Sequence, residues 1–327
     1  MRRSLAIVAI AAAAPALAND TTASTGAGGL VIERTSAIDM ASEDLFVSAA
    51  EIRIRYIFRN RTARDVSTIV AFPMPDRNLA SEYGGDVAYP SGFRTTVGGR
   101  PVTTRLERKA MVKGRDHSAV LARLGVPLAP DSINDSTRAM DRLTPADKRR
   151  LVALGLAGEE EYDDNGKGMQ RHLIPLWTVQ DRHYWTQRFP AGRDLNVDHR
   201  YVPGVGGSTD TPVAFKQFRH TEDSRWAIRR YCMDAAFIAA IDRVAGKDPL
   251  KGPGLPDQRI DYVLTTGANW ARPIGRFRLV VDKGEPGNLV SFCESGVRKI
   301  GPTRYEVVHR NWRPTRDLHV LIVSPQR

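Results

Sequence analysis

Short segments in which apolar and polar residues alternate recur along the sequence, and they constrain the fold more than any other feature. The sharpest alternation covers residues 51–59, where Ile52, Ile54, Tyr56 and Phe58 are interleaved with mostly charged side chains. This pattern is typical of a half-buried antiparallel strand, because successive side chains of a strand point to opposite faces of a sheet. Residues 66–72 form a second β-prone run, which ends at prolines that cannot donate to a ladder.

Further β-prone runs separated by turn residues predict a mostly β protein. They cover residues 93–97, 102–106, 177–189, 195–201, 260–265, 276–281, 289–293, 305–310 and 318–323. Strands at such short intervals favour a sandwich or a barrel over a parallel sheet. We therefore expect an antiparallel β-sandwich over residues 19–205 and a C-terminal β region over residues 206–327. The small, polar residues 19–29 predict a loop or an extended lead-in.

Helical patterns interrupt the strands in two places. Residues 118–124 form one predicted helix, and a second begins at the N-cap Thr144, with Pro145 in its first position and Asp147 in its first turn. This helical hairpin predicts an insertion over residues 107–168, closed by a solvated acidic loop at 159–164. In the C-terminal region, Asp234 caps a predicted helix that runs to Val244.

The first eighteen residues have the pattern of an export signal. Arg2 and Arg3 precede an apolar run at residues 5–14, and Ala16-Leu17-Ala18 is a small-x-small cleavage pattern. We expect cleavage between Ala18 and Asn19 and a periplasmic or secreted protein. The apolar run is too short to span a bilayer, and no later stretch approaches the roughly twenty residues required, so we predict no membrane span.

Cys232 and Cys293 are the two cysteines of the chain. An even pair in an exported protein predicts one disulfide, which closes a loop of about 62 residues and stabilises the fold by roughly 4 kcal/mol on the chain-entropy model. Buried thiols, or a redox or metal pair, are the alternatives. The Cys-x-x-Cys spacing of a redox motif is absent, so the structural disulfide is favoured.

The charge of the chain raises the question of an anionic partner. The formal net charge is +11, and loss of Arg2 and Arg3 with the leader lowers it to +9. Lipid head groups or wall polymers are partners that such a charge attracts. However, the basic residues alternate with acidic ones and form no long block, which favours a solvated surface. An envelope protein or an anionic wall or lipid component remains the expected partner, and we predict no nucleic-acid binding.

Motifs for familiar catalytic sites are absent from the sequence. There is no Gly-x-Ser-x-Gly, no His-Glu-x-x-His and no phosphate-binding loop. Asp181 and His183 share a strand face and could orient an imidazole for acid–base chemistry or a metal, although an ion pair is the simpler interpretation. His199 alternates with apolar residues and is expected in the core. Asp181, His183 and His199 are the weak catalytic candidates.

Two other candidate sites are weaker than their structural alternatives. Glu161, Asp163, Asn165 and Gly166 match part of a calcium loop, but the closing position falls on His172 instead of a bidentate glutamate, so a solvated acidic loop is favoured. We predict no cofactor. A set of aromatic residues could line a sugar or peptide groove, but aromatics on strands more often pack in a core. The set comprises Trp177, Tyr184, Trp185, Tyr201, Trp226 and Trp270.

Several blocks of the sequence together resemble one family. They are residues 19–22, Gly28-Gly29-Leu30, Ser42-Glu43-Asp44-Leu45, residues 56–62, 70–75, 189–192 and 199–201, Val205-Gly206-Gly207, and residues 264–270 and 277–283. The chain is similar to the DUF4424 family of exported bacterial proteins, which has no assigned function. The resemblance covers essentially the whole mature chain and carries over no catalytic residue. The opening strand pair with its Phe-Pro-x-Pro turn also resembles immunoglobulin-like sandwiches, by fold analogy alone.

The sequence thus predicts an immunoglobulin-like antiparallel β-sandwich with a helical-hairpin insertion and a C-terminal β region carrying one helix. The favoured function is a non-catalytic binding or scaffold module of the cell envelope. The alternatives are a periplasmic hydrolase or metal-dependent enzyme using Asp181, His183 and His199, and a binder of anionic polymers.

Overall fold

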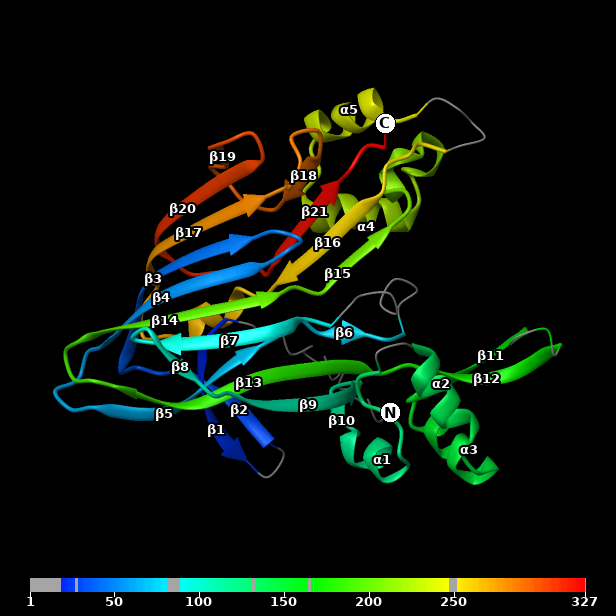
Figure 1. The fold of residues 1–327 in the computed structure, drawn as a ribbon, viewed down its shortest axis with the longest axis horizontal. Coiled ribbons are helices and arrows are strands. Elements are labelled where there is room, and N and C mark those ends of the chain that lie inside the picture. Colours follow the sequence, from blue (N-terminus) through cyan, green and yellow to red (C-terminus); the bar gives the residue numbers. More distant parts are fainter. Residues whose placement is uncertain are drawn as a thin grey trace, which may run out of the picture.

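The computed structural model describes residues 19–26, 29–80, 89–130, 133–163, 166, 168–246 and 252–326. The expected leader and Asn165 of the calcium pattern lie outside these residues. The described chain is mostly β, with several sheets and five helices (Figure 1). No helix in this part of the chain is long and apolar enough to cross a membrane.

The strands form three larger sheets and one separate hairpin. A seven-stranded sheet runs β10 (Arg115–Asp116), β9 (Arg105–Val112), β13 (Thr178–Phe189), β5 (Val66–Pro73), β1 (Thr21–Gly26), β2 (Gly29–Glu33), with β6 (Arg77–Asn78) also paired to β13. An eight-stranded sheet runs β19 (Arg298–Lys299), β20 (Arg304–Trp312), β17 (Ile274–Asp282), β3 (Ile38–Val47), β4 (Ile52–Asn60), β14 (Asp194–Val202), β7 (Ser91–Val97), β8 (Arg100–Val102). A four-stranded sheet runs β15 (Val205–Ser208), β16 (Asp257–Tyr262), β21 (Leu318–Val323), β18 (Leu289–Phe292), and the hairpin pairs β11 (Ala157–Asp163) with β12 (Met169–Pro175).

The predicted alternation on β4 is confirmed by the packing. Ile52, Ile54, Tyr56 and Phe58 are all buried in the largest hydrophobic core, which also takes side chains from the seven- and four-stranded sheets. Each such side chain contributes roughly 1.5–3 kcal/mol of transfer free energy when fully buried. The inward face of β4 is therefore a major source of stability for the whole molecule.

The eight-stranded sheet contains strands from both ends of the chain. β17 pairs with β3 in parallel, with Leu279 opposite Leu45, while the other strand pairs of this sheet are antiparallel. Strands from both sides of residue 205, the predicted boundary, therefore lie side by side in this sheet.

The start of the described chain is more ordered than its composition predicts. Where small, polar residues predict a loop or lead-in, residues 21–26 form β1, which pairs with β2 and β5. The threonines bond to backbone instead of solvent: Thr22 Oγ1 donates to the Glu33 carbonyl at 3.0 Å. Side chains that are typical of loops thus lie on a buried strand between β5 and β2.

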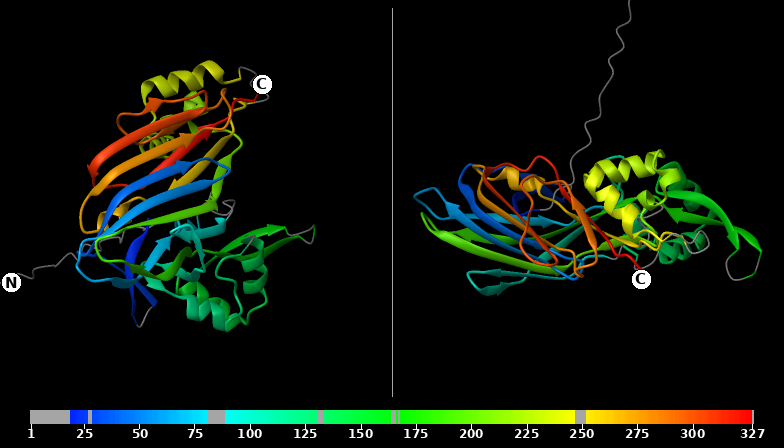
Figure 2. Two further views of the ribbon diagram at one scale, coloured as in Figure 1. Left: turned by 60° about the vertical axis from the view of Figure 1, so that its left-hand side comes forward. Right: turned by 90° about the horizontal axis from the view of Figure 1, so that it is seen from above.

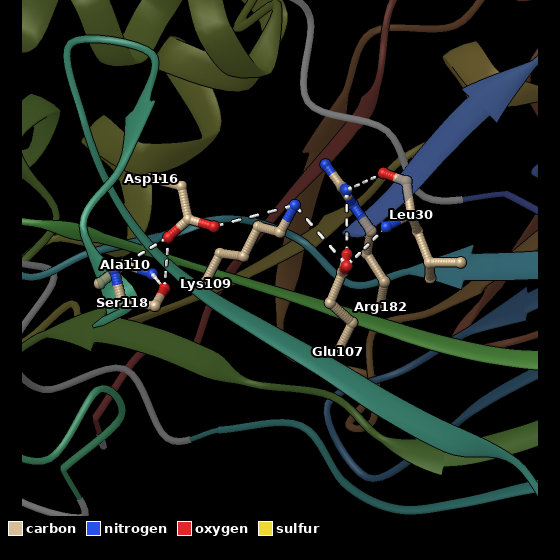
Figure 3. A network of polar contacts seen from close by, with 7 residues as sticks. All are labelled: Leu30, Glu107, Lys109, Ala110, Asp116, Ser118 and Arg182. Carbon is tan, nitrogen blue, oxygen red and sulfur yellow. Dashed lines mark hydrogen bonds and ion pairs between the residues drawn. The ribbon is translucent and has the colours of Figure 1, made fainter. Parts of the chain in front are cut away.

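A polar network anchors β2 to β9 and β13 (Figure 3). Oε1 of Glu107 accepts a hydrogen bond from the Leu30 amide at 2.7 Å, and Oε2 lies 3.1 Å from Nη1 of Arg182. That same Nη1 donates to the Leu30 carbonyl at 3.1 Å, and Lys109 Nζ lies 3.6 Å from Glu107. Gly29 has φ +101°, and a Cβ there would meet Glu107 Oε1 at 2.1 Å, so glycine permits this close approach.

The helices form two groups at different places on the sheets (Figures 1 and 2). α1 (Ser118–Arg123), α2 (Ile133–Asp141) and α3 (Pro145–Ala153) share a second core with Trp177 and Val179 at the start of β13. α4 (Glu222–Tyr231) and α5 (Ala235–Val244) pack with β21 in a third core. Three short 3₁₀ turns complete the set: η1 (Pro212–Ala214), η2 (Lys216–Phe218) and η3 (Thr265–Asn269).

The predicted helix caps are confirmed, whereas the structure contains two helices and one strand that the sequence did not predict. Thr144 accepts a hydrogen bond from the Asp147 amide, and Asp234 accepts one from the Phe237 amide. α2 and α4 have no counterpart among the predicted helices. The acidic loop predicted at 159–164 is also wrong over residues 159–163, because they belong to β11, where register with β12 places Glu161 opposite the basic Arg171.

Candidate ligand-binding site

A cleft of about 600 Å³ lies where β6, β15, β16 and α4 meet. This volume is in the range of clefts that hold small organic molecules. Two of its walls come from distant parts of the sequence, since β6 follows β5 and α4 lies about 150 residues later. Its lining comprises Pro75, Asp76, Arg77, Asn78, Pro90, Gly204, Gly206, Gly207, Pro212, Glu222, Asp223, Trp226, Ala227, Arg230, Tyr231, Arg259 and Asp261.

Trp226 presents an exposed aromatic ring on the α4 wall. The residue is 46% exposed although most tryptophans of the chain are buried. The Arg230 guanidinium lies over this ring, 5.0 Å from its centroid, and its Nη2 is 3.0 Å from Asp261 Oδ2. Asp261 Oδ1 lies 2.7 Å from Nδ1 of His319. This chain of contacts fixes the arginine, so that the indole has a rigid neighbour.

The carboxylate of Asp261 is held in its charged form at this wall. Burial disfavours the charge, but hydrogen bonding by His319 and the positive charge of Arg230 outweigh it and lower the pKa of Asp261. Beside it, burial raises the pKa of Tyr231 to about 12, so this phenol stays neutral. The Arg230 charge is therefore neutralised within the protein.

The floor of the cleft is made by β15 and β16, which approach closely. A Cβ on Gly207 would lie 2.4 Å from the Asp257 carbonyl oxygen, so this position requires glycine. Arg259 Nη2 lies 2.9 Å from Asp257 Oδ2 and donates to Ser208 Oγ at 3.1 Å. Like Arg230, Arg259 has its counter-ion inside the protein.

Of the other charged side chains that line the cleft, Asp76, Glu222 and Asp223 are acidic, and Arg77 is buried with its guanidinium over the Tyr89 ring. Asp76 accepts a hydrogen bond from Gln180 Nε2 at 2.8 Å, and Glu222 pairs with Arg229 of the same helix. Asp223 forms no ion pair with any residue that the structure describes. A ligand entering the cleft therefore meets an aromatic ring and carboxylates, rather than free cations.

The three catalytic candidates have structural partners. Asp181 is bound by both Nε and Nη2 of Arg108, at 2.7 and 2.6 Å. His199 is buried, with Nε2 3.0 Å from Asp20 Oδ1 and Nδ1 3.0 Å from Thr95 Oγ1. His183 stacks on Phe93 with ring centroids 4.2 Å apart, and burial lowers its pKa to about 4, so it is neutral at physiological pH. A catalytic role for the three residues stays a prediction.

The two calcium candidates that can be described lie on the β11–β12 hairpin. Glu161 pairs with Arg171, and Asp163 accepts a hydrogen bond from the Gly168 amide at 3.1 Å. Within the described ranges, no three His, Cys, Asp or Glu side chains are grouped so that they could hold a metal ion. The hairpin pairing gives both acids a structural role.

Cys232 and Cys293 lie at disulfide distance, with 2.03 Å between the sulfur atoms. This link joins the residue that ends α4 to the segment after β18. It therefore ties the helix that carries Trp226 to the four-stranded sheet that forms the floor of the cleft.

Of the aromatic residues singled out in the sequence, only Trp226 faces the cleft. Trp177, Trp185, Tyr201 and Trp270 are buried, as expected for core residues. The sequence contains one clue to the difference: Trp226 sits among charged residues, Asp223, Arg225, Arg229 and Arg230, instead of on an alternating strand.

A family model described as a domain of unknown function, DUF4424, matches residues 18–321. The chain belongs to the DUF4424 family. No curated protein matches this DUF4424 chain. Among solved structures it is similar to a crystallised protein of Legionella pneumophila subsp. pneumophila str. Philadelphia 1 that is described as a "putative nutrient binding protein". The two share 16% sequence identity with a TM-score of 0.48, over 94% of this chain and 70% of that one.

Proposed function

We propose that this DUF4424 protein is an exported, non-catalytic binding protein of the cell envelope. Its ligand is a small organic molecule that carries a ring and a cationic or N–H donating group, and it occupies the cleft between β6 and α4. The observation that carries the proposal is the exposed Trp226 ring in a cleft that also contains Asp223, which forms no ion pair with any described residue.

The charge distribution supports this ligand chemistry over an anionic one. Arg230 and Arg259 are each paired with an aspartate, so an anion would have to displace an internal ion pair. Asp223 needs no such displacement to accept a cationic group. The aromatic face of Trp226 adds stacking or cation–π contact, which is worth about 0.5–1 kcal/mol at an exposed site.

The proposal includes an exported location and an immunoglobulin-like scaffold. The leader pattern of residues 1–18 and the cysteine pair at disulfide distance fit a protein that works in an oxidising compartment. The seven- and eight-stranded sheets share one core, which fits the immunoglobulin-like sandwich that we propose as the scaffold.

Two probes of opposite charge and similar shape test the ligand class. We expect phenethylamine to bind the purified protein and to shift the NMR signals of Trp226, and phenylacetate to bind at least tenfold more weakly. Trp226→Ala and Asp223→Asn should each weaken phenethylamine binding, whereas Phe218→Ala should not, since Phe218 is an equally exposed aromatic outside the cleft lining. Equal binding of both probes, or binding insensitive to Trp226→Ala, contradicts the proposal.

A further inference from the structure

A glutamate without a counter-ion lies in the largest core of the molecule. Glu43 of β3 has an exposed fraction of 0%, and none of the ion pairs formed by the described residues includes it. Oε2 accepts a hydrogen bond from Asn19 Nδ2 at 3.0 Å, while Oε1 is buried with no hydrogen-bond partner in the described chain. A buried carboxylate with an unused oxygen needs either a proton or a cation.

The groups that face Glu43 are acidic, phenolic or already paired. Asp20 pairs with His199, and both side chains are fully buried. The Tyr56 hydroxyl donates to Asn19 Oδ1 and lies 3.1 Å from the Tyr262 hydroxyl. Asp44, the next residue along β3, adds a further negative charge and pairs with Arg276 at the surface. No side chain in this cluster offers Glu43 a positive charge.

Burial shifts the protonation of this carboxyl in the direction expected for an uncompensated charge. Desolvation raises the pKa of Glu43 to about 8, although the hydrogen bond from Asn19 and a weaker interaction with the Tyr262 hydroxyl oppose it. By comparison, Glu107 at the edge of the seven-stranded sheet has Arg182 and Lys109 beside it. The core therefore contains a carboxyl group that stays protonated near neutral pH, because the described side chains around it supply no cation.

The residue that contacts Glu43 is also the first residue of the expected mature chain. Asn19 is itself 0% exposed. Its backbone nitrogen is four bonds from Nδ2, hence within about 5 Å of the atom that already bonds to Glu43. We propose that Glu43 is the counter-ion of the α-ammonium group that cleavage between Ala18 and Asn19 releases, so that export processing completes the core.

The step is an ordinary peptide hydrolysis and its charges balance. Signal peptidase adds one water molecule across the Ala18–Asn19 bond, so that Ala18 leaves as a carboxylate and Asn19 gains an α-ammonium group. Cleavage acts on the translocating chain, before the sheets close over Asn19. The ammonium then supplies Oε1 of Glu43 with N–H donors and a positive charge, which no amide nitrogen of the uncut chain provides.

The test is performed on the exported, processed protein with its natural leader. Intact mass should show a chain that begins at Asn19, and cleavage at another bond overturns the proposal. The α-amine, labelled with ¹⁵N in asparagine, is then titrated by NMR. We expect its pKa to lie at least one unit above the ordinary value of about 8.

Two isosteric variants separate the ion pair from general destabilisation. In Glu43→Gln the raised α-amine pKa should be lost, while Glu107→Gln, which alters a glutamate with its own cations, should leave it unchanged. An α-amine pKa at or below the ordinary value in the unsubstituted protein overturns the proposal even if Glu43→Gln does not fold. Because none of these readouts involves the cleft, their failure leaves the proposed ligand binding unaffected.

Discussion

Two glutamates hold the beginning of the chain in place, and they do so in opposite environments. Glu107 bonds to the backbone of β2 at the partly exposed face of the seven-stranded sheet, with Arg182 and Lys109 beside it (Figure 3). Glu43 bonds to Asn19 in the fully buried core, without a cation among the described side chains. The residues that they contact, Leu30 and Asn19, are only eleven positions apart in the sequence.

This difference shows how burial decides what a carboxylate requires. At the partly exposed face of the sheet, the Arg182 and Lys109 cations beside Glu107 offset the cost of its partial burial. In the core, the same group must be protonated or fully paired, and removal of a partner leaves a buried charge. The buried network should therefore dominate stability, and it should respond to pH and to processing in ways that the surface network does not.

The largest expected effect is on the buried pair of Asp20 and His199. Asp20→Ala removes the partner of a fully buried imidazole, and we expect the free energy of unfolding to fall by about 3–5 kcal/mol. Asp116→Ala, in the surface network with Lys109, should lose only about 1 kcal/mol. Urea unfolding of the mature protein measures both, and equal losses would refute the distinction between the two networks.

Much of the fold could be predicted from sequence where the side-chain period is regular. The strand at residues 52–60, the cap at Thr144 and the helix beginning at Ala235 all follow from local patterns. Glu43 could not be placed in the same way. The register of β3 against β4 shifts between Met40 and Ser42, and this irregularity turns Glu43 toward the core together with Leu45 and Val47.

The candidate binding cleft could not be predicted from the sequence for a different reason. The cleft depends on long-range pairing that brings Asp76 near α4, and half of the residues of α4 are charged, which leaves few apolar positions to mark it as a helix. Local periodicity carries no information on which distant segments meet. The catalytic candidates, in contrast, share only a sequence spacing. Their partners Arg108, Thr95 and Asp20 lie on other segments, so the spacing could not identify them.

The pH dependence of stability distinguishes the two glutamates further. Without an ammonium group nearby, the folded pKa of Glu43 is about 8, above its unfolded value of about 4.5, so the folded state binds the extra proton. The free energy of unfolding should then fall as pH rises from about 4.5 to 8, by up to about 1.4 kcal/mol per pH unit. We expect this slope in a chain with Gly-Ser-Gly-Ser ahead of Asn19, which moves the terminal charge away.

The mature chain, with its ammonium group next to Glu43, should lack most of this slope. Asp20 is present in both forms, so its raised pKa cancels in the comparison. Glu43→Gln in the extended chain should flatten the curve, whereas Glu107→Gln should not. A flat profile for the extended chain with Glu43 intact would count against an uncompensated carboxyl in the core.

The smallest expected effect comes from Gly29, which allows Glu107 to reach β2. Gly29→Ala adds a Cβ at φ +101° and displaces the glutamate from the Leu30 amide, for a loss of about 2 kcal/mol. Gly98→Ala is the matched control: its φ is +54° and its Cβ would meet open space, so only backbone strain of about 1 kcal/mol applies. When Glu107→Ala is already present, Gly29→Ala should lower the free energy of unfolding by little more than Gly98→Ala does. The contact that Gly29→Ala displaces no longer exists in that protein. An undiminished loss in that background, measured by urea unfolding, would show that Gly29 serves the backbone alone and that the Glu107 contact contributes nothing to holding β2.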